Sequence, residues 1–145
     1  MPGELYLEIV TAERLLYSGP VTLISAPAAD GRVGILPGHA SLLTALLPGE
    51  LRLRPRGDDE QISIAISGGF LEVSNDRAII LARSAERAVE IDVERAFQAR
   101  ERAVKRLQER SAAIDTERAR AAAARAEARL RVAERYRQAH PGEGR

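Results

Sequence analysis

Short apolar runs separated by turn residues fill the first part of the chain. The runs that we interpret as strands are 5–10, 21–26, 62–67, 70–73 and 78–82. Within 62–67, isoleucines alternate with small polar or apolar residues, a period of two that is typical of a half-buried strand. Gly19-Pro20 would open the second run, Gly68-Gly69 permits a sharp change of direction, and Asn75-Asp76 is a turn signal. The pattern predicts an antiparallel β-sandwich or flattened barrel.

After residue 84 the apolar spacing becomes helical. Residues 92–110 contain no Gly or Pro, and Ala96, Ala99, Ala103 and Leu107 recur at helical intervals. A polar break at Ser111 precedes a second helix over about 116–138. Its inner stripe would be Ala119, Ala122, Ala126, Leu130 and Ala133. Because the break is short, the two helices are expected to form an antiparallel hairpin with an alanine-rich, weakly packed seam.

Gly and Pro mark the boundary between these two parts. Residues 1–84 hold 9 of the 11 Gly and 6 of the 7 Pro, and the rest lie in the tail. The sequence therefore predicts an α+β chain, with a β-sandwich at 1–84, a helical hairpin at 85–140 and a flexible tail at 141–145.

The net charge of +1 conceals an asymmetry between the two parts. Residues 1–84 carry 7 Arg and 10 acids, a sum of −3, and residues 85–145 carry 15 Lys and Arg and 11 acids, a sum of +4. The basic hairpin suits an acidic or phosphate-bearing partner, although scattered arginines are equally ordinary solvation. There is no cysteine, no apolar run near the ~20 residues of a membrane span, and no signal-peptide pattern at the N-terminus.

The pattern Ile-Asp-x-Glu-Arg-Ala occurs twice, at 91–96 and 114–119. Asp is a strong N-cap, since its carboxylate accepts the unpaired amide hydrogens of the first turn. Both Asp92 and Asp115 are therefore expected to begin helices, and whether Asp92 has a second role is left open.

Several segments, in order, resemble the epsilon subunits of F-type rotary ATP synthases. Residues 31–40, GRVGILPGHA, resemble the family's G-x-x-G-I-x-P-G-H loop, and 67–73, SGGFLEV, resemble its S-G-G-x-x-E-V segment. Residues 85–96 and 129–134 resemble the family's domain junction, first helix and second helix. The ordered set covers nearly the whole chain.

The resemblance implies a non-catalytic rotor subunit that helps couple ion flow to ATP synthesis. Its partners would be the gamma subunit, the c-subunit ring and, through an extended hairpin that inhibits hydrolysis, the catalytic beta and alpha subunits. The loop facing the rotor would be formed by Arg32, Ile35, Pro37 and His39. Arg32 departs from the family, where several members carry an acid there. The subunit would lie on the cytoplasmic face of the bacterial membrane, attached only through the complex.

The resemblance also implies a regulatory ATP site on the folded hairpin, formed by Glu86, Ile91, Asp92, Arg95, Arg125 and Arg129. Glu86 and Asp92 would accept bonds from the adenine and ribose. Arg125 and Arg129 are four apart and share a helix face, so that with Arg95 three guanidiniums would meet the triphosphate. The chain has no G-x-x-x-x-G-K-[ST] loop, so hydrolysis is not expected and ATP would be a regulator rather than a required cofactor.

Other classes of function fit less well. A nucleic-acid-binding hairpin would explain the arginines, but the aromatic content of 3% offers few stacking platforms. An enzyme would need a convergent acid, base or nucleophile, and a metal site is not expected from two His and no Cys. The sequence leaves open the ATP affinity, the strength of inhibition, the resting hairpin conformation and whether the coupling ion is H⁺ or Na⁺.

Overall fold

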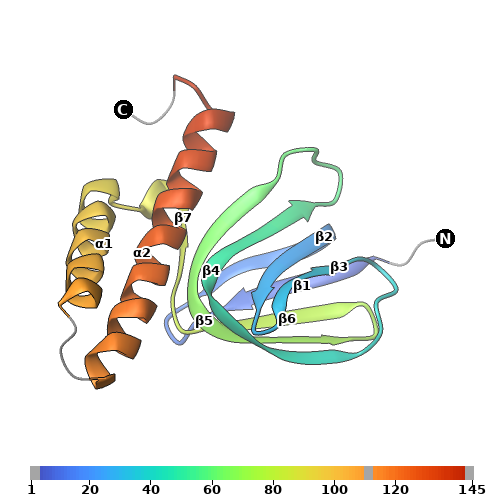
Figure 1. Ribbon diagram of the computed structural model, residues 1–145. Coiled ribbons are helices and arrows are strands. Elements are labelled where there is room, and N and C mark those ends of the chain that lie inside the picture. Colours follow the sequence, from blue (N-terminus) through green and yellow to red (C-terminus); the bar gives the residue numbers. More distant parts are fainter. Residues whose placement is uncertain (1–3, 110–112, 143–145) are drawn as a thin grey trace.

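A β-barrel with a helical hairpin against one side makes up the molecule (Figure 1). The computed structural model describes residues 4–109 and 113–142. The strands are β1 Leu5–Val10, β2 Leu15–Ala28, β3 Gly31–Ile35, β4 Leu42–Pro55, β5 Ile62–Ser74, β6 Arg77–Ala82 and β7 Ala85–Arg87. A short 3-10 helix η1, Ala88–Glu90, leads into α1, Val93–Gln108, and α2, Ala113–Ala139. The predicted fold class is confirmed.

The sheet closes on itself. Its strand order is β1-β6-β5-β4-β2-β3, and an additional pairing between β1 and β2 completes the barrel. The β1–β6 pair is parallel, and the other pairs among the described residues are antiparallel. Alternate residues of each strand point inward, so fully buried Leu5, Ile24, Leu51, Ile64 and Ile80 meet in one core.

The strands are longer than the apolar runs suggested. Strand β2 passes through Gly19-Pro20, because β1 pairs with this part of β2. Strand β5 likewise runs through Gly68-Gly69 without ending. The predicted strand boundaries at these glycines were wrong, since cross-strand pairing continues past them. The change of direction expected at Gly68-Gly69 is present, as a bend within β5. The sequence pattern placed the residues of β3 in a loop, and it did not predict β4.

Gly69 is required by close backbone contact rather than by a turn. It has φ of +152°, and a Cβ atom there would lie 2.0 Å from the carbonyl oxygen of Leu81. The glycine therefore lets β5 bend while it remains paired with both β4 and β6. Strand β7 then pairs with the first half of β5, so the sheet continues for 3 residues past residue 84.

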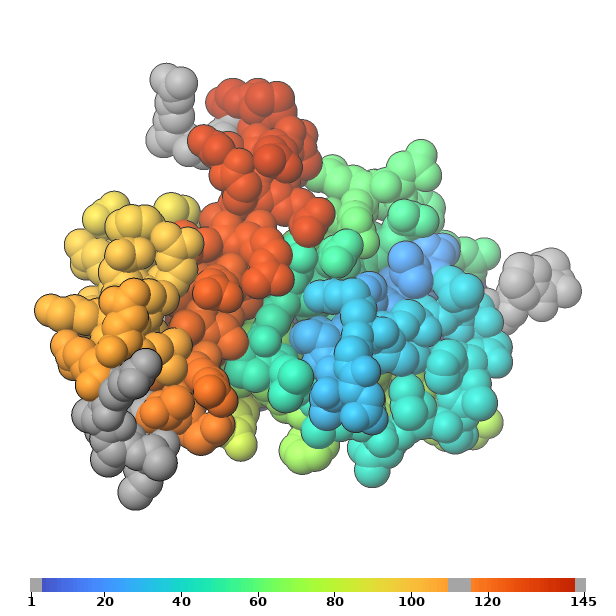
Figure 2. All heavy atoms as spheres, in the orientation of Figure 1, coloured from blue at the N-terminus to red at the C-terminus, as the bar shows by residue number. Residues whose placement is uncertain are grey.

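The two helices run antiparallel, and α2 lies between α1 and the barrel (Figures 1 and 2). Asp92 caps α1 as predicted, because its Oδ1 accepts the Arg95 amide at 3.1 Å. The expectation for Asp115 was wrong, since α2 begins at Ala113 and Asp115 is inside the helix. The predicted break at Ser111 lies outside the described residues.

Helix α2 has two buried faces, whereas the sequence predicted one stripe. Ala119 and Ala126 are buried, as are Ala96 and Ala103 of α1. Ala128 and Val132 form a second face, which is fully buried against the sheet. A helix that is packed on both sides does not show a single apolar stripe in its sequence.

Candidate functional site

A row of three side chains on the outer surface of the barrel positions the hairpin. Glu50 of β4 is paired in register with Ala65 of β5, which is paired in turn with Glu86 of β7. Neighbours in such a row point to the same face of the sheet. A small apolar residue is therefore flanked by two carboxylates.

Helix α2 carries the complementary residues. Arg129 Nε donates to Glu86 Oε1 at 2.6 Å, and Arg135 Nε and a terminal nitrogen donate to the two oxygens of Glu50 at 2.6 and 3.0 Å. Between the two arginines, Val132 packs in a cluster with Ala65. Residues three apart lie on one helix face, so the spacing 129, 132, 135 follows the row across the strands.

Glu50 is the one buried charged residue among those the structure describes, with 1% of its surface exposed. Arg52 Nε lies 3.5 Å from its Oε1, in addition to the two bonds from Arg135. Burial raises the pKa of Glu50, but the hydrogen bonds of Arg135 and the Ser63 hydroxyl, with the charges of Arg135 and Arg52, outweigh burial and hold the pKa below its ordinary value of 4.5. The carboxylate is thus kept ionised by residues of both the barrel and the hairpin.

The structure brings together part of the predicted nucleotide site. Glu86, Arg125 and Arg129 line one small depression beside Ala65 and Ser84. Glu86 and Arg129 are bonded to each other there. Ile91 is instead packed with Ala65, Ala128 and Val132, where it anchors the start of α1.

Asp92 and Arg95 meet at the beginning of α1 through the helix cap. Within residues 4–109 and 113–142, the Arg95 and Arg125 side chains make no hydrogen bond or ion pair. These two guanidiniums are therefore available, while Arg129 is occupied by a carboxylate.

The predicted rotor loop is divided between different environments. Ile35 is fully buried in the barrel core. Arg32 turns back toward the barrel, donating to the Ser25 carbonyl and hydroxyl oxygens at 3.1 and 2.9 Å and to the Glu50 carbonyl at 2.5 Å. Pro37 and His39 stand at the loop tip, where the His39 ring nitrogen Nδ1 is 2.7 Å from the Ala40 carbonyl oxygen.

An exposed apolar surface lies on the half of β4 and β5 that the hairpin does not contact. We call it the β5–β6 face, and its members are Leu43, Phe70, Ile79 and Leu81, with exposures of 70, 56, 36 and 54%. Phe70 pairs in register with Leu81, and Glu72 pairs with both Leu43 and Ile79. The Gly38 amide donates to Asp76 Oδ1 at 2.6 Å, which ties the loop tip to the β5–β6 turn.

Sequence reasoning missed both Glu50–Arg135 and the β5–β6 face. The sequence signal for the first was the charged Glu50 next to the apolar Leu51. The signal for the second was Phe70, which directly precedes the buried Leu71 and therefore points to the other side of the strand. In the described part of the chain, no group of three His, Cys, Asp or Glu could hold a metal, and no helix is long and apolar enough to cross a membrane.

Comparison with known proteins matches the whole arrangement. The family "ATP synthase, Delta/Epsilon chain, beta-sandwich domain" matches residues 4–88, and "ATP synthase, Delta/Epsilon chain, long alpha-helix domain" matches residues 90–134. The chain is 50% identical over 101 residues to the ATP synthase epsilon chain of Desulforamulus reducens, covering 70% of this chain and 75% of that one. It is 57% identical over 96 residues to the epsilon chain of Chloroflexus aurantiacus, covering 66% and 68%.

Solved structures show the same fold. A chain of the Euglena gracilis mitochondrial ATP synthase, in a structure of OSCP, F1 and the c-ring, superposes with a TM-score of 0.71 at 26% identity, covering 96% of this chain and 82% of that one. A chain of the Tetrahymena thermophila mitochondrial ATP synthase central stalk and c-ring has a TM-score of 0.60 at 13% identity, covering 88% and 95%, and supports the fold alone.

Replacing Arg135 by Ala should destabilise the docked hairpin by about 2 kcal/mol, because a buried carboxylate loses its bidentate partner and keeps only Ser63 and Arg52. Hydrogen exchange of α2 amides would report the loss. Arg137→Ala is the matched control, since Arg137 bonds Glu134 on the surface and should change exchange little. Equal exchange in both variants would show that Glu50 does not hold the hairpin.

The pH dependence of exchange is a second readout of the same variant. Since the folded pKa of Glu50 lies below 4.5, the stability it contributes is complete above pH 4.5 and is lost as pH falls through the folded pKa. In Arg135→Ala, the stability of the docked hairpin should therefore fall less than in the parent as the pH is lowered through this range.

Proposed function

This chain belongs to the ATP synthase epsilon-chain family, whose members are non-catalytic subunits of the synthase, and from that premise we propose that it is a rotor subunit whose hairpin regulates hydrolysis. The barrel would bind the gamma subunit and the c-subunit ring. The hairpin would leave the barrel and reach the catalytic beta and alpha subunits. In this assembly the chain would be peripheral, at the cytoplasmic face of a bacterial membrane.

The β5–β6 face is the observation that supports docking to the rotor. Clustered exposed apolar residues commonly mark a protein interface, and on this face they surround one carboxylate, that of Glu72. This face lies on the half of the long strands opposite to the half that carries Glu50 and Ala65, so a partner bound there would leave the hairpin free to move. We assign the gamma subunit to the face and the c-ring to the adjoining loop tip at Pro37 and His39.

Phe70→Glu should weaken co-purification with gamma by about a hundredfold or more, because a charge would be buried at the centre of an apolar interface. The isolated variant should unfold at the parent's temperature, since Phe70 is already 56% exposed. Val93→Glu, on an apolar residue of α1 that is 51% exposed, adds the same charge away from the face and should bind gamma normally. Normal gamma binding by Phe70→Glu would remove the support for this docking mode.

The manner in which the hairpin is docked supports a two-state regulator. Its contacts with the sheet centre on one row of three residues, and alanine lines much of the α1–α2 seam. Alanine buries little area per residue, so this packing contributes little free energy at ~25 cal/mol per Å². A segment held in this way can open without unfolding the barrel.

In the assembled synthase, Arg135→Ala should strengthen inhibition of hydrolysis, because a docked form weakened by ~2 kcal/mol shifts the docked-to-extended ratio about thirtyfold. Deleting the chain from Val89 onward should have the opposite effect and abolish inhibition. Steady-state hydrolysis at fixed ATP measures both, and Arg137→Ala is the control. If hydrolysis by the deletion equals that of the parent, the hairpin is not an inhibitor in this protein.

We further propose that ATP stabilises the docked hairpin at Glu86, Asp92, Arg95, Arg125 and Arg129. The convergence of Glu86, Arg125 and Arg129 supports this site, as do the uncommitted guanidiniums of Arg95 and Arg125, although the depression between the first three is closed while Glu86 and Arg129 are bonded. Binding would require the Glu86–Arg129 bond to open, so that phosphate replaces the carboxylate on Arg129. This exchange costs one partly exposed ion pair and gains charge-assisted bonds to the triphosphate.

Arg125→Ala should weaken ATP binding about tenfold or more, since a charge-assisted hydrogen bond is lost while helix propensity improves. Arg125 gives a cleaner test than Arg129, whose removal also breaks the bond to Glu86. Arg120→Ala, on the same helix but paired with Glu117, should bind as the parent does. Calorimetry with the isolated chain distinguishes the outcomes, and absence of binding at millimolar ATP would leave Asp92 as a helix cap only.

A further inference from the structure

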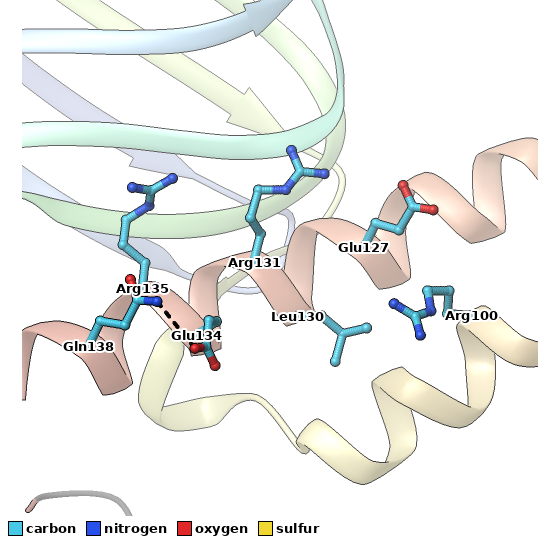
Figure 3. Close-up of a pocket in the computed structure, with 7 residues that line it drawn as sticks. All are labelled: Arg100, Glu127, Leu130, Arg131, Glu134, Arg135 and Gln138. Carbon is cyan, nitrogen blue, oxygen red and sulfur yellow. Dashed lines mark hydrogen bonds between the residues drawn. The ribbon is translucent and has the colours of Figure 1, made fainter. Parts of the chain in front are cut away.

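Four guanidinium groups gather where the barrel meets the flank of α2 opposite to the one on which Arg129 bonds Glu86. Arg52 comes from β4 and Arg32 from β3, while α2 contributes Arg131 and Arg135. Figure 3 shows Arg131 and Arg135 extending from α2 toward the sheet, on the side opposite to Leu130 and Arg100. The charges of Arg52, Arg131 and Arg135 all act on Arg32.

Two carboxylates lie among these arginines, that of Glu50 and that of Glu127, which stands four residues before Arg131 on α2, so four positive charges and two negative leave an excess of two. Arg135 occupies both oxygens of Glu50, and Arg32 bonds only the Glu50 carbonyl oxygen. Glu134, which lies nearby on α2, is committed to Arg137 and Gln138. The positive charge of this region between β3 and α2, which we call the β3–α2 seam, is therefore not neutralised by the described residues.

The electrostatic cost of this crowding falls on Arg32. Burial lowers the pKa of Arg32, and repulsion from Arg52, Arg131 and Arg135 lowers it further, with Glu50 alone opposing them. Arg131 is exposed and makes no hydrogen bond or ion pair with any residue that the structure describes. An anion from solvent could therefore reach it, and would relieve the repulsion on Arg32.

We propose that the seam between β3 and α2 binds a small oxyanion of the phosphate class, held by Arg32 of the barrel and Arg131 of the hairpin. The guanidinium fork of Arg131 suits the tetrahedral oxygens of such an anion. Arg32, which already donates to Ser25 and to the Glu50 carbonyl oxygen, would contribute its charge and its remaining N–H groups. Because its two principal contacts belong to the barrel and to the hairpin, the anion binds the docked form alone and stabilises it.

This seam is distinct from the proposed ATP site. Arg129 and Arg131 are two residues apart, hence ~200° apart around the helix. Arg129 bonds Glu86 on β7, and Arg131 acts on Arg32 on the opposite flank. The two sites can be separated by single substitutions.

Titration of the isolated full chain with inorganic phosphate, followed by NMR at constant pH and with ionic strength balanced by sodium chloride, tests the proposal. We expect saturable shifts at the seam and about tenfold weaker binding by Arg131→Ala, while Arg102→Ala, on the exposed surface of α1, changes the affinity less than about twofold. At one hundred times the parent's dissociation constant, phosphate should slow exchange of α2 amides about a hundredfold in the parent and only about tenfold in Arg131→Ala.

Three outcomes would overturn the proposal. Shifts that rise without saturation and are matched by chloride would show a general ionic effect. Unchanged affinity in Arg131→Ala would exclude the seam. Loss of phosphate binding in Arg125→Ala instead of Arg131→Ala would place the anion at the ATP site, because Arg125 makes no docking hydrogen bond or ion pair of its own among the residues that the structure describes.

Discussion

A carboxylate buried beneath a helix must have a positive partner, and the position of the hairpin follows from this requirement. Glu50 is covered by α2, and burial of an isolated charge costs several kcal/mol. Arg135 offsets this cost only when α2 crosses β4 at one position along the strand and with one rotation about the helix axis. That placement also sets Val132 against Ala65 and Arg129 against Glu86. The buried charge therefore specifies one docked geometry for a hairpin whose alanine seam specifies little by itself.

Two long strands give the barrel two separate working surfaces. The first half of β5 and the second half of β4 carry the hairpin, and the remaining halves carry the β5–β6 face. Gly69 lets β5 bend between these halves without losing its partners. Under the function that we propose, this separation would let the subunit stay attached through one surface while the hairpin leaves the other.

The arginines of α2 give the docked hairpin more than one point of control. Arg135 is committed to Glu50, and Arg129 to Glu86 on one flank. Arg131 stands uncommitted among the described residues on the other flank, beside Arg32. Phosphate groups on either flank would strengthen docking, one by exchanging with a carboxylate and the other by neutralising excess charge. In both proposals a ligand would bias the equilibrium between the docked and the extended hairpin.

The amino-acid sequence determined those features that depend on near neighbours. Alternation of Ile62, Ile64 and Ile66 specified a strand with one face in the core, and Asp92 specified the start of α1, since period and capping act within a few residues. The ordered motifs also specified the family. The same local reasoning failed at Asp115 and Gly68-Gly69, where continued helix or strand pairing outweighed an apparent stop signal.

Only the tertiary structure decided what those elements do together. Glu50 and Arg135 are 85 residues apart, and they meet because the registers of β4, β5 and β7 align one outward row that α2 then crosses. Ile35 belongs to a loop-like motif yet is buried, because β3 pairs with β2 and turns it into the core. Strand register and helix rotation arise from cross-strand bonds and packing summed over the whole molecule, and no single segment of sequence contains them.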